Sequence, residues 1–220
     1  MNLSKIIGII SYFPEDKNIK NNRKDKLDNL INKCNLLFNL PIILIAQNYT
    51  KQDLIYFKSK YKNILIHEYE KLGIVGARNK LRDLFLNNYN FDYLIMLDDD
   101  IVLEGDSKSA LEYLKQIDEH PNCYGEFNKT LLKLFAISRY IFNKECFDEN
   151  VNPEKEEGFE DRYFVNILRV KYPDNRFIFN PNNLNQYSEA SCDKNSTWYI
   201  EQNLSKMLLN TKDLIDNIKY

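Results

Sequence analysis

One stretch decides the expected fold of this chain: Tyr93-Leu-Ile-Met-Leu-Asp98-Asp99-Asp100-Ile-Val102. Its apolar start, with aromatic and β-branched residues close by, is typical of a buried strand, and three carboxylates follow at once. Three acids at the mouth of a buried strand repel one another and resist the loss of water, so a cation is their natural partner. Mg²⁺ and Mn²⁺ prefer such oxygen ligands, whereas a solvated acidic turn is the plainer interpretation.

Working outward, the first half of the chain alternates between strands and helices. Apolar runs predict strands over 5–11, 42–46 and 63–67, in addition to the strand over 93–97. The intervening helices are marked by Leu27, Leu30, Ile31, Cys34, Leu37 and Phe38, by a start at Thr50 or Asp53 with Leu54 and Phe57, and by Leu81, Leu84 and Phe85 after Gly73. This alternation predicts an α/β fold with a mostly parallel sheet flanked by helices. Ligands bind beyond the carboxyl ends of such strands, where the acids lie.

The second half is less regular. We expect a helix with Ala110, Leu111, Leu114 and Ile117, strands at 131–138 and 140–143, a polar loop over 150–158, a helix over 159–170, a strand over 177–179 and a loop-rich stretch over 180–197. Apolar residues at helical spacing near the end predict a C-terminal helical extension. We therefore expect one domain over 1–200 with a helix over 201–220 packed on it.

Composition limits the function classes. The 220 residues are 44% hydrophobic and carry a formal net charge of -2, so nothing draws the whole chain toward nucleic acid or an anionic membrane. The four cysteines, Cys34, Cys123, Cys146 and Cys192, lack the spacing of a zinc site or a disulfide framework. No apolar run is long enough for a transmembrane segment, and we expect a cytoplasmic protein with reduced thiols.

Three motifs follow in an informative order: GIVGARNKLRDLFL from Gly73, LIMLDDDIVL from Leu94 and EEGFEDRYFVNIL from Glu156. This order resembles the nucleotide-sugar-dependent glycosyltransferases of the GT-A fold, especially the inverting family 2-like enzymes with an Asp-x-Asp motif. The resemblance covers roughly residues 5–170, and it implies a Rossmann-like central sheet.

The resemblance also implies roles for single residues. Asp98 and Asp100 would hold Mn²⁺ or Mg²⁺ with the donor diphosphate, Asp100 most directly and Asp98 nearer the ribose or sugar, with Asp99 also at the donor. Glu160 and Asp161 would face the acceptor, and Asp161 would be the catalytic base. The donor would further be met by Ser11, Tyr12 and Arg78.

Two departures from the family pattern concern the donor. Many relatives carry an acid after the second strand, where this chain has the neutral amides Gln47 and Asn48, which can still pair with a base edge. Many relatives also place a histidine late in the chain, but none follows His120 here. Lys194 and Trp198 lie in a late segment that is a candidate to close over the donor, and Asp193 or Glu189 is a candidate further metal ligand.

The expected function is therefore inverting, metal-dependent transfer of a sugar from a nucleotide-diphospho donor, a UDP-sugar being favoured. A Mg²⁺-dependent nucleotidyltransferase is an alternative, although Ser11-Tyr-Phe-Pro14 is not the glycine-rich basic loop of those enzymes. A non-catalytic sugar- or nucleotide-binding module is another. The acceptor stays open between a glycan, a lipid, a protein and a modified DNA base. A DNA acceptor would need a basic groove, to which the basic run 17–26 is the one obvious contributor. The plainer interpretation of this run is a solvated loop and helix start.

Overall fold

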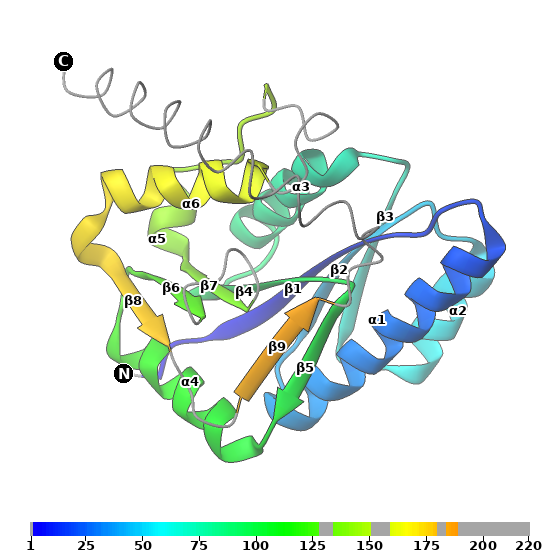
Figure 1. Cartoon of the computed structure of the whole chain (residues 1–220), viewed down its shortest axis with the longest axis horizontal. Helices are drawn as coiled ribbons and strands as arrows, with labels where there is room; N and C mark the ends of the chain where they lie inside the picture. The colour runs from blue at the N-terminus through cyan, green and yellow to red at the C-terminus, as the bar shows by residue number, and fades with distance from the viewer. Residues whose placement is uncertain (1, 128–133, 151–158, 180–183, 189–220) are drawn as a thin grey trace.

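The computed structural model describes residues 2–127, 134–150, 159–179 and 184–188 of the chain. In this described part, seven strands form one sheet in the order β3-β2-β1-β4-β7-β6-β8, and two further strands form a separate ribbon (Figure 1). The strands of the sheet are β1 Lys5–Tyr12, β2 Ile42–Gln47, β3 Ile64–Tyr69, β4 Tyr93–Asp98, β6 Tyr124–Phe127, β7 Phe135–Ser138 and β8 Arg176–Phe179. The ribbon pairs β5 (Ile101–Gly105) with β9 (Leu184–Ser188) in antiparallel fashion.

The pairing within the sheet is mostly parallel. β1 lies parallel between β2 and β4, β3 is parallel to β2, and β8 is parallel to β6. Among the described strands of the sheet, β7 alone runs antiparallel to both of its neighbours. Parallel strands are normally covered on both faces, and β2 is accordingly buried along its whole length. The predicted α/β fold class with a mostly parallel, Rossmann-like sheet is confirmed.

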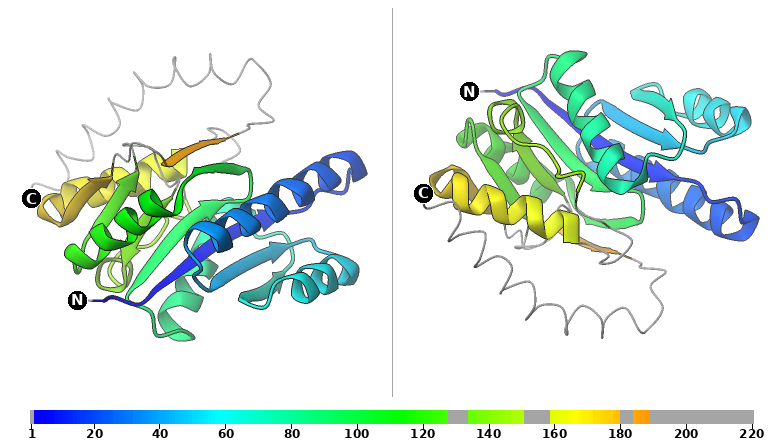
Figure 2. Two further views of the ribbon diagram at one scale, coloured as in Figure 1. Left: turned by 90° about the horizontal axis from the view of Figure 1, so that it is seen from below. Right: turned by 90° about the horizontal axis from the view of Figure 1, so that it is seen from above.

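Helices cover both faces of the sheet. They are α1 Lys17–Leu37, α2 Lys51–Lys60, α3 Gly73–Asn87, α4 Ser107–Glu119, α5 Arg139–Phe142 and α6 Phe159–Lys171, with a short 3₁₀ helix, η1, at Pro173–Asn175. Seen from below, α1 and α4 lie in front of the sheet, and seen from above, α3 and α6 do (Figure 2). Among the helices of the described residues, none has the length and apolar character that crossing a bilayer requires.

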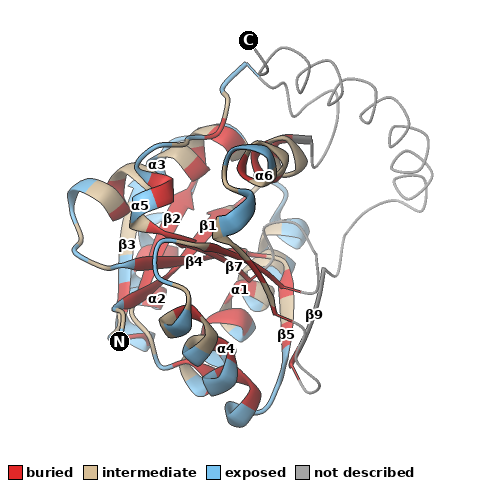
Figure 3. Ribbon diagram, turned by 90° about the vertical axis from the view of Figure 1, so that its left-hand side faces the viewer, coloured by how far each residue is buried: buried red, intermediate tan, exposed pale blue. Residues whose placement is uncertain are grey.

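The alternation of side chains along β1 divides the interior into two cores. Ile7 and Ile9 pack on one face with residues of α1, α2 and α4, whereas Ile6 and Ile10 pack on the other with residues of α3, α5 and α6. The buried strands therefore form a continuous layer between the two sets of helices (Figure 3). Because β1 and β4 are fixed from both sides, the residues at their carboxyl ends are held by a rigid support.

The structure differs from the prediction at one predicted strand, at one core position and at three strands that were not predicted. Residues 140–143 lie in helix α5 and its C-cap, because the Ser138 hydroxyl accepts from the Ile141 amide and caps a helical turn there. Leu111 is exposed on α4 and does not face the core. The predicted loop-rich stretch contains β9, and β5 and β6 are strands that the sequence pattern does not predict.

A glycine explains why the sequence pattern did not predict strand β6. Gly125 lies in the middle of β6, opposite Phe177 of β8, and a Cβ atom there would come within 2.1 Å of the Phe177 ring. The position therefore needs glycine for close packing, although glycine in a short segment usually suggests a turn. The predicted strand over 131–138 is observed as β7 from Phe135, and residues 131–133 lie outside the described residues.

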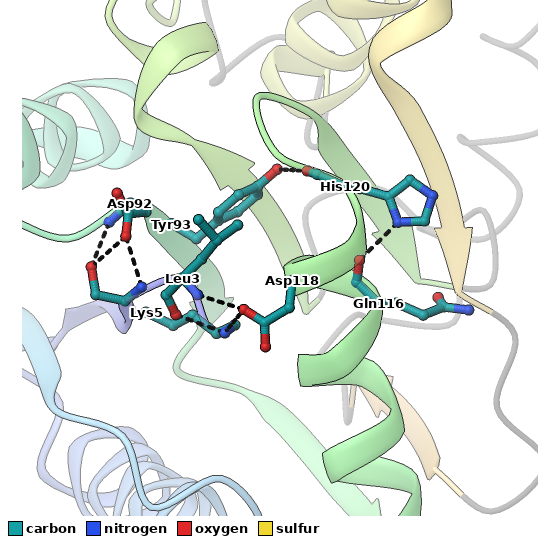
Figure 4. Close-up of polar contacts among 8 residues, drawn as sticks. Leu3, Lys5, Asp92, Tyr93, Gln116, Asp118 and His120 are labelled. Carbon is teal, nitrogen blue, oxygen red and sulfur yellow. Dashed lines mark hydrogen bonds and ion pairs between the residues drawn. The ribbon is translucent and has the colours of Figure 1, made fainter. Parts of the chain in front are cut away.

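A polar network fixes the amino-terminal edge of the sheet (Figure 4). The Lys5 ammonium donates to the Asp118 carboxylate at 2.6 Å and to the Leu3 carbonyl at 2.7 Å. The Tyr93 hydroxyl donates to the His120 carbonyl and accepts a hydrogen bond of 2.9 Å from the Cys123 amide. These contacts tie α4 and the segment after it to the starts of β1 and β4, at the opposite edge of the sheet from the three aspartates.

Candidate active site

A pocket of about 300 Å³ opens at the carboxyl ends of β1, β2 and β4. Parallel α/β sheets bind their ligands at this edge. The prediction that the three aspartates lie at the carboxyl end of a strand is confirmed. Six of the residues singled out from the sequence line the pocket together, although they come from three strands and the turn after β4. The lining residues are Ile10, Ser11, Tyr12, Arg23, Gln47, Lys71, Gly73, Ile74, Asp98, Asp99 and Asp100.

The three aspartates do not have equivalent surroundings. Asp99 is buried and accepts a hydrogen bond of 2.6 Å from the Ser11 hydroxyl, which in turn accepts one of 2.8 Å from the Tyr49 hydroxyl. Burial raises the pKa of the Asp99 carboxyl to about 6, because the nearby Arg23 guanidinium and the Ser11 hydroxyl offset the loss of water only in part. Asp99 therefore faces β1, while Asp98 and Asp100 also line the pocket.

Arg78 connects the end of β4 to the start of α6. Its side chain is 1% exposed. One terminal nitrogen, Nη1, donates to Glu160 Oε1 at 2.9 Å and also to the Asp161 carboxylate. The other, Nη2, lies 3.2 and 3.4 Å from the two carboxylate oxygens of Asp98. A single guanidinium from α3 therefore brings the two predicted acidic motifs together.

The acidic pair lies in the first turn of α6, where negative charge is favourable near the unpaired amides of a helix. The helix is fixed by Phe164, Val165 and Leu168, which are buried against residues of α3 and α5. Glu160 is 3% exposed, and Asp161 is 15% exposed. Asp161 is thus the more accessible of the two carboxylates.

The two amides after the second strand bond to the backbone. Gln47 Oε1 accepts from the amide of Leu72, the residue before α3, at 2.9 Å. Gly73, the first residue of α3, has a φ of 71° that favours glycine. Asn48 Nδ2 donates to the Phe13 carbonyl at 2.7 Å. Asn48 lines a neighbouring hollow of about 620 Å³ rather than the pocket itself; that hollow is formed by Asn48, Tyr49, Glu68, Tyr69, Glu70 and Lys71.

Two cations of the pocket were missed by sequence reasoning. Arg23 reaches in from α1, where Nη1 donates to the Tyr12 carbonyl at 3.3 Å and lies 3.7 Å from Asp99 Oδ2. Lys71 lies in the turn before α3, with its ammonium 5.7 Å from the centre of the Tyr12 ring. The basic run 17–26 forms the first turns of α1, so the helix start of the plainer interpretation is confirmed and the loop is not. The helical spacing of Arg23 with Leu27 was a signal that this residue faces inward.

The acids of the pocket suit a cation whose coordination is completed by substrate. Within residues 2–127, 134–150, 159–179 and 184–188, no group of three or more His, Cys, Asp or Glu side chains is placed so that it can hold a metal ion. Mg²⁺ is commonly held by one or two carboxylates together with substrate phosphates, so Asp98 and Asp100 beside an open pocket fit that manner of binding.

Four residues considered from the sequence, Glu189, Asp193, Lys194 and Trp198, lie outside the described residues, as does the predicted helix over 201–220.

Comparisons with known proteins identify the fold. No model of a protein family matches the sequence, and no curated protein matches it. The structure is similar to that of S. aureus TarS 1-349 in complex with UDP-GlcNAc, with a TM-score of 0.60 and 13% identity over 83% of this chain and 58% of that one. This chain thus spans less than two thirds of the TarS chain.

Two further structures have the same fold. The mannosyltransferase PcManGT from Pyrobaculum calidifontis, in complex with GDP-Man and Mn²⁺, gives a TM-score of 0.57 at 12% identity, over 82% of this chain and 55% of that one. A Bacillus anthracis protein named as a glucose-1-phosphate thymidylyltransferase gives a TM-score of 0.56 at 10% identity, over 84% of this chain and 89% of that one. At such identities the likeness shows the fold that these transferases share.

Proposed function

We propose that this protein transfers a sugar from a nucleotide-diphospho donor to an acceptor hydroxyl, with inversion at the anomeric carbon. One observation carries the proposal: Asp98 and Asp100 line a pocket at the end of β4, and Arg78 links that end to a second pair of carboxylates on α6. The ligands named for the similar structures, UDP-GlcNAc and GDP-Man with Mn²⁺, support this class of donor.

The donor occupies the pocket in this proposal. Asp98 and Asp100 would hold Mn²⁺ or Mg²⁺, which when bound supplies a Lewis acid to neutralise charge on the departing diphosphate. Arg23 and Lys71 line the same pocket and bring cationic donors toward the diphosphate. Ser11, Tyr12 and Gln47 form the wall on the β1 and β2 side, where the nucleoside lies. A UDP-sugar remains the favoured donor.

The acceptor approaches from the α6 side. The Asp161 carboxylate takes the proton of the acceptor hydroxyl as that oxygen attacks the anomeric carbon from the face opposite the diphosphate. General base catalysis of this kind typically contributes about 10²–10⁴-fold to the rate. Glu160 is more deeply buried and holds Arg78, so its role is to position the neighbouring carboxylate.

The experiment measures release of nucleoside diphosphate from a panel of UDP- and GDP-sugars with Mn²⁺, together with binding of the nucleotide. We expect Asp161→Asn to lower turnover by about 10²–10⁴-fold while nucleotide binding at saturating Mn²⁺ stays within about twofold. We expect Asp100→Asn to weaken Mn²⁺-dependent nucleotide binding. Asp83→Asn, which removes an exposed acid of α3, is the matched control. Undiminished turnover in the Asp161 variant would contradict the proposed base, and tight nucleotide binding without turnover would indicate a binding module.

Nucleotidyl transfer is the second candidate, because the Bacillus anthracis protein is matched over 89% of its length. The two reactions release different products. A nucleotidyltransferase releases pyrophosphate from a nucleoside triphosphate and a sugar phosphate, whereas a glycosyltransferase releases a nucleoside diphosphate. Pyrophosphate release from a nucleoside triphosphate and a sugar phosphate would favour this alternative.

A further inference from the structure

Arg78 does not lie where a direct phosphate ligand is expected. Its guanidinium is 1% exposed and, among the described residues, is not part of the pocket lining. Its hydrogen bonds go to Asp98, Glu160 and Asp161, and its charged group lies 5.5 Å from the centre of the Phe147 ring. The side chain therefore acts within the protein, between the proposed metal ligand and the proposed base.

Arg78 is shared among three carboxylates. Nη1 bonds to Glu160 and Asp161, and Nη2 bonds to Asp98. An arginine stays charged in proteins, and a buried charge that loses its partners is costly. If one carboxylate is taken away by another cation, the guanidinium must therefore bond more fully to the two that remain.

The geometry indicates which carboxylate is given up. The bonds from Nη2 to Asp98 measure 3.2 and 3.4 Å, longer than the 2.9 Å bond from Nη1 to Glu160. Asp98 is also the most exposed of the three partners, at 25%, compared with 3% for Glu160 and 15% for Asp161. A cation arriving from the pocket meets Asp98 first, at the weaker side of the guanidinium.

From these contacts we infer that a divalent cation displaces Arg78 from Asp98, so that filling the donor site shifts the hold of Arg78 onto the Glu160–Asp161 pair. Arg78 is thus a positioning residue that couples the donor side of the site to the base. This inference rests on the proposed function, because it takes Asp98 as a metal ligand. Coupling between two sites is reciprocal, so a change at Asp161 must alter cation binding at Asp98.

The test is a double-mutant cycle on binding of Mn²⁺ alone, measured from the electron paramagnetic resonance signal of the free ion. Asp161→Asn removes one competitor for Arg78, so the guanidinium bonds Asp98 more strongly and competes better with the ion. We expect the dissociation constant for Mn²⁺ to rise about fivefold or more in this variant. In an Arg78→Met background, we expect Asp161→Asn to change the dissociation constant for Mn²⁺ by less than about twofold.

The cycle separates coupling through Arg78 from simple electrostatics. Loss of the Asp161 charge weakens binding of a cation through space in either background, so an equal effect in both backgrounds would overturn the inference. Arg78→Lys is the second background: it keeps the charge, and its single nitrogen lacks the fork that joins the two sides, so the effect of Asp161→Asn shrinks there as well.

Controls distinguish failure of this inference from failure of the proposed function. Asp83→Asn, also on α3, removes a carboxylate that pairs with Arg82, and we expect it to leave Mn²⁺ binding unchanged. If Mn²⁺ binds only when UDP is present, the cycle is measured with UDP at saturating concentration. If the unaltered protein binds no Mn²⁺ even with UDP, the proposed metal site fails and the inference fails with it. If Mn²⁺ binds and the cycle shows no coupling, the inference alone fails.

Discussion

The three aspartates after β4 show how like charges are held together at the end of a buried strand. The sequence predicts that a cation relieves their repulsion, and the protein supplies part of that relief itself. Arg78 of α3 bonds to Asp98, and Arg23 of α1 lies 3.7 Å from Asp99. Arg78 does not line the pocket, whereas Arg23 forms part of its wall, so a divalent ion and a diphosphate remain compatible with both.

Arg23 offers a direct test of the proposal that the nucleotide-sugar donor binds in the pocket. Replacing Arg23 with alanine removes a guanidinium that lines the pocket beside Asp99. Because a hydrogen bond to a charged group is worth about 1.5–3 kcal/mol, we expect binding of UDP or GDP with Mn²⁺ to weaken by about tenfold or more. Titration calorimetry measures this loss, and Lys33→Ala, an exposed residue of the same helix, is the matched control. Equal affinities in the two variants would rule out a role for Arg23 at the donor.

At the scale of elements, α1 and α2 are joined by a carboxylate that also caps α2. Thr50 and Asp53 form a capping box, and Lys20 and Lys24 of α1 both pair with Asp53. Burial alone would raise the pKa of Asp53, but the hydrogen bonds from Lys20, Thr50 and Lys24 outweigh it and lower the pKa to about 2. This carboxylate therefore stabilises the helix on which Arg23 is presented.

The lowered pKa predicts how stability changes with pH. A carboxyl with a depressed pKa in the folded state contributes stability that is fully present above its unfolded value of about 4 and is lost as the pH falls toward 2. We expect Asp53→Asn to reduce the free energy of unfolding by about 1–2 kcal/mol at pH 7. The difference from the unaltered protein should shrink between pH 5 and pH 2, as followed by urea denaturation. A difference that is constant with pH would contradict the assigned pKa.

Across the whole molecule, local pattern was sufficient where a strand is buried on both faces. The apolar runs predicted β1, β2 and β4 because each is a continuous, almost fully buried hydrophobic segment. They also predicted β3 from its apolar start, although Leu65 of that strand is exposed. β5, β6 and β9 depend on partners that are distant in the sequence, such as Phe177 opposite Gly125. Tertiary contacts decide whether such short segments become strands, and these contacts cannot be predicted from the periodicity of apolar residues.

The site follows the same division. Ser11, Tyr12, Gln47 and the three aspartates meet because parallel strands end at one edge, which the order of the strands predicts. Only the family resemblance predicted that Glu160 and Asp161 belong to the same site as the aspartates. In the structure, Arg78 bonds to both of these acids and to Asp98, which explains their position physically. Arg23 and Lys71 enter the pocket from a helix and a turn, so their place depends on how these elements pack against the sheet.

The measurement that tests the central claim most directly is the position of Mn²⁺ in crystals grown with Mn²⁺ and UDP or GDP, located by its anomalous scattering. The account predicts an anomalous peak within bonding distance of the Asp100 and Asp98 carboxylates, with diphosphate oxygens completing the coordination. Nucleotide in the pocket without Mn²⁺ beside these aspartates, or Mn²⁺ bound elsewhere on the protein, would contradict it.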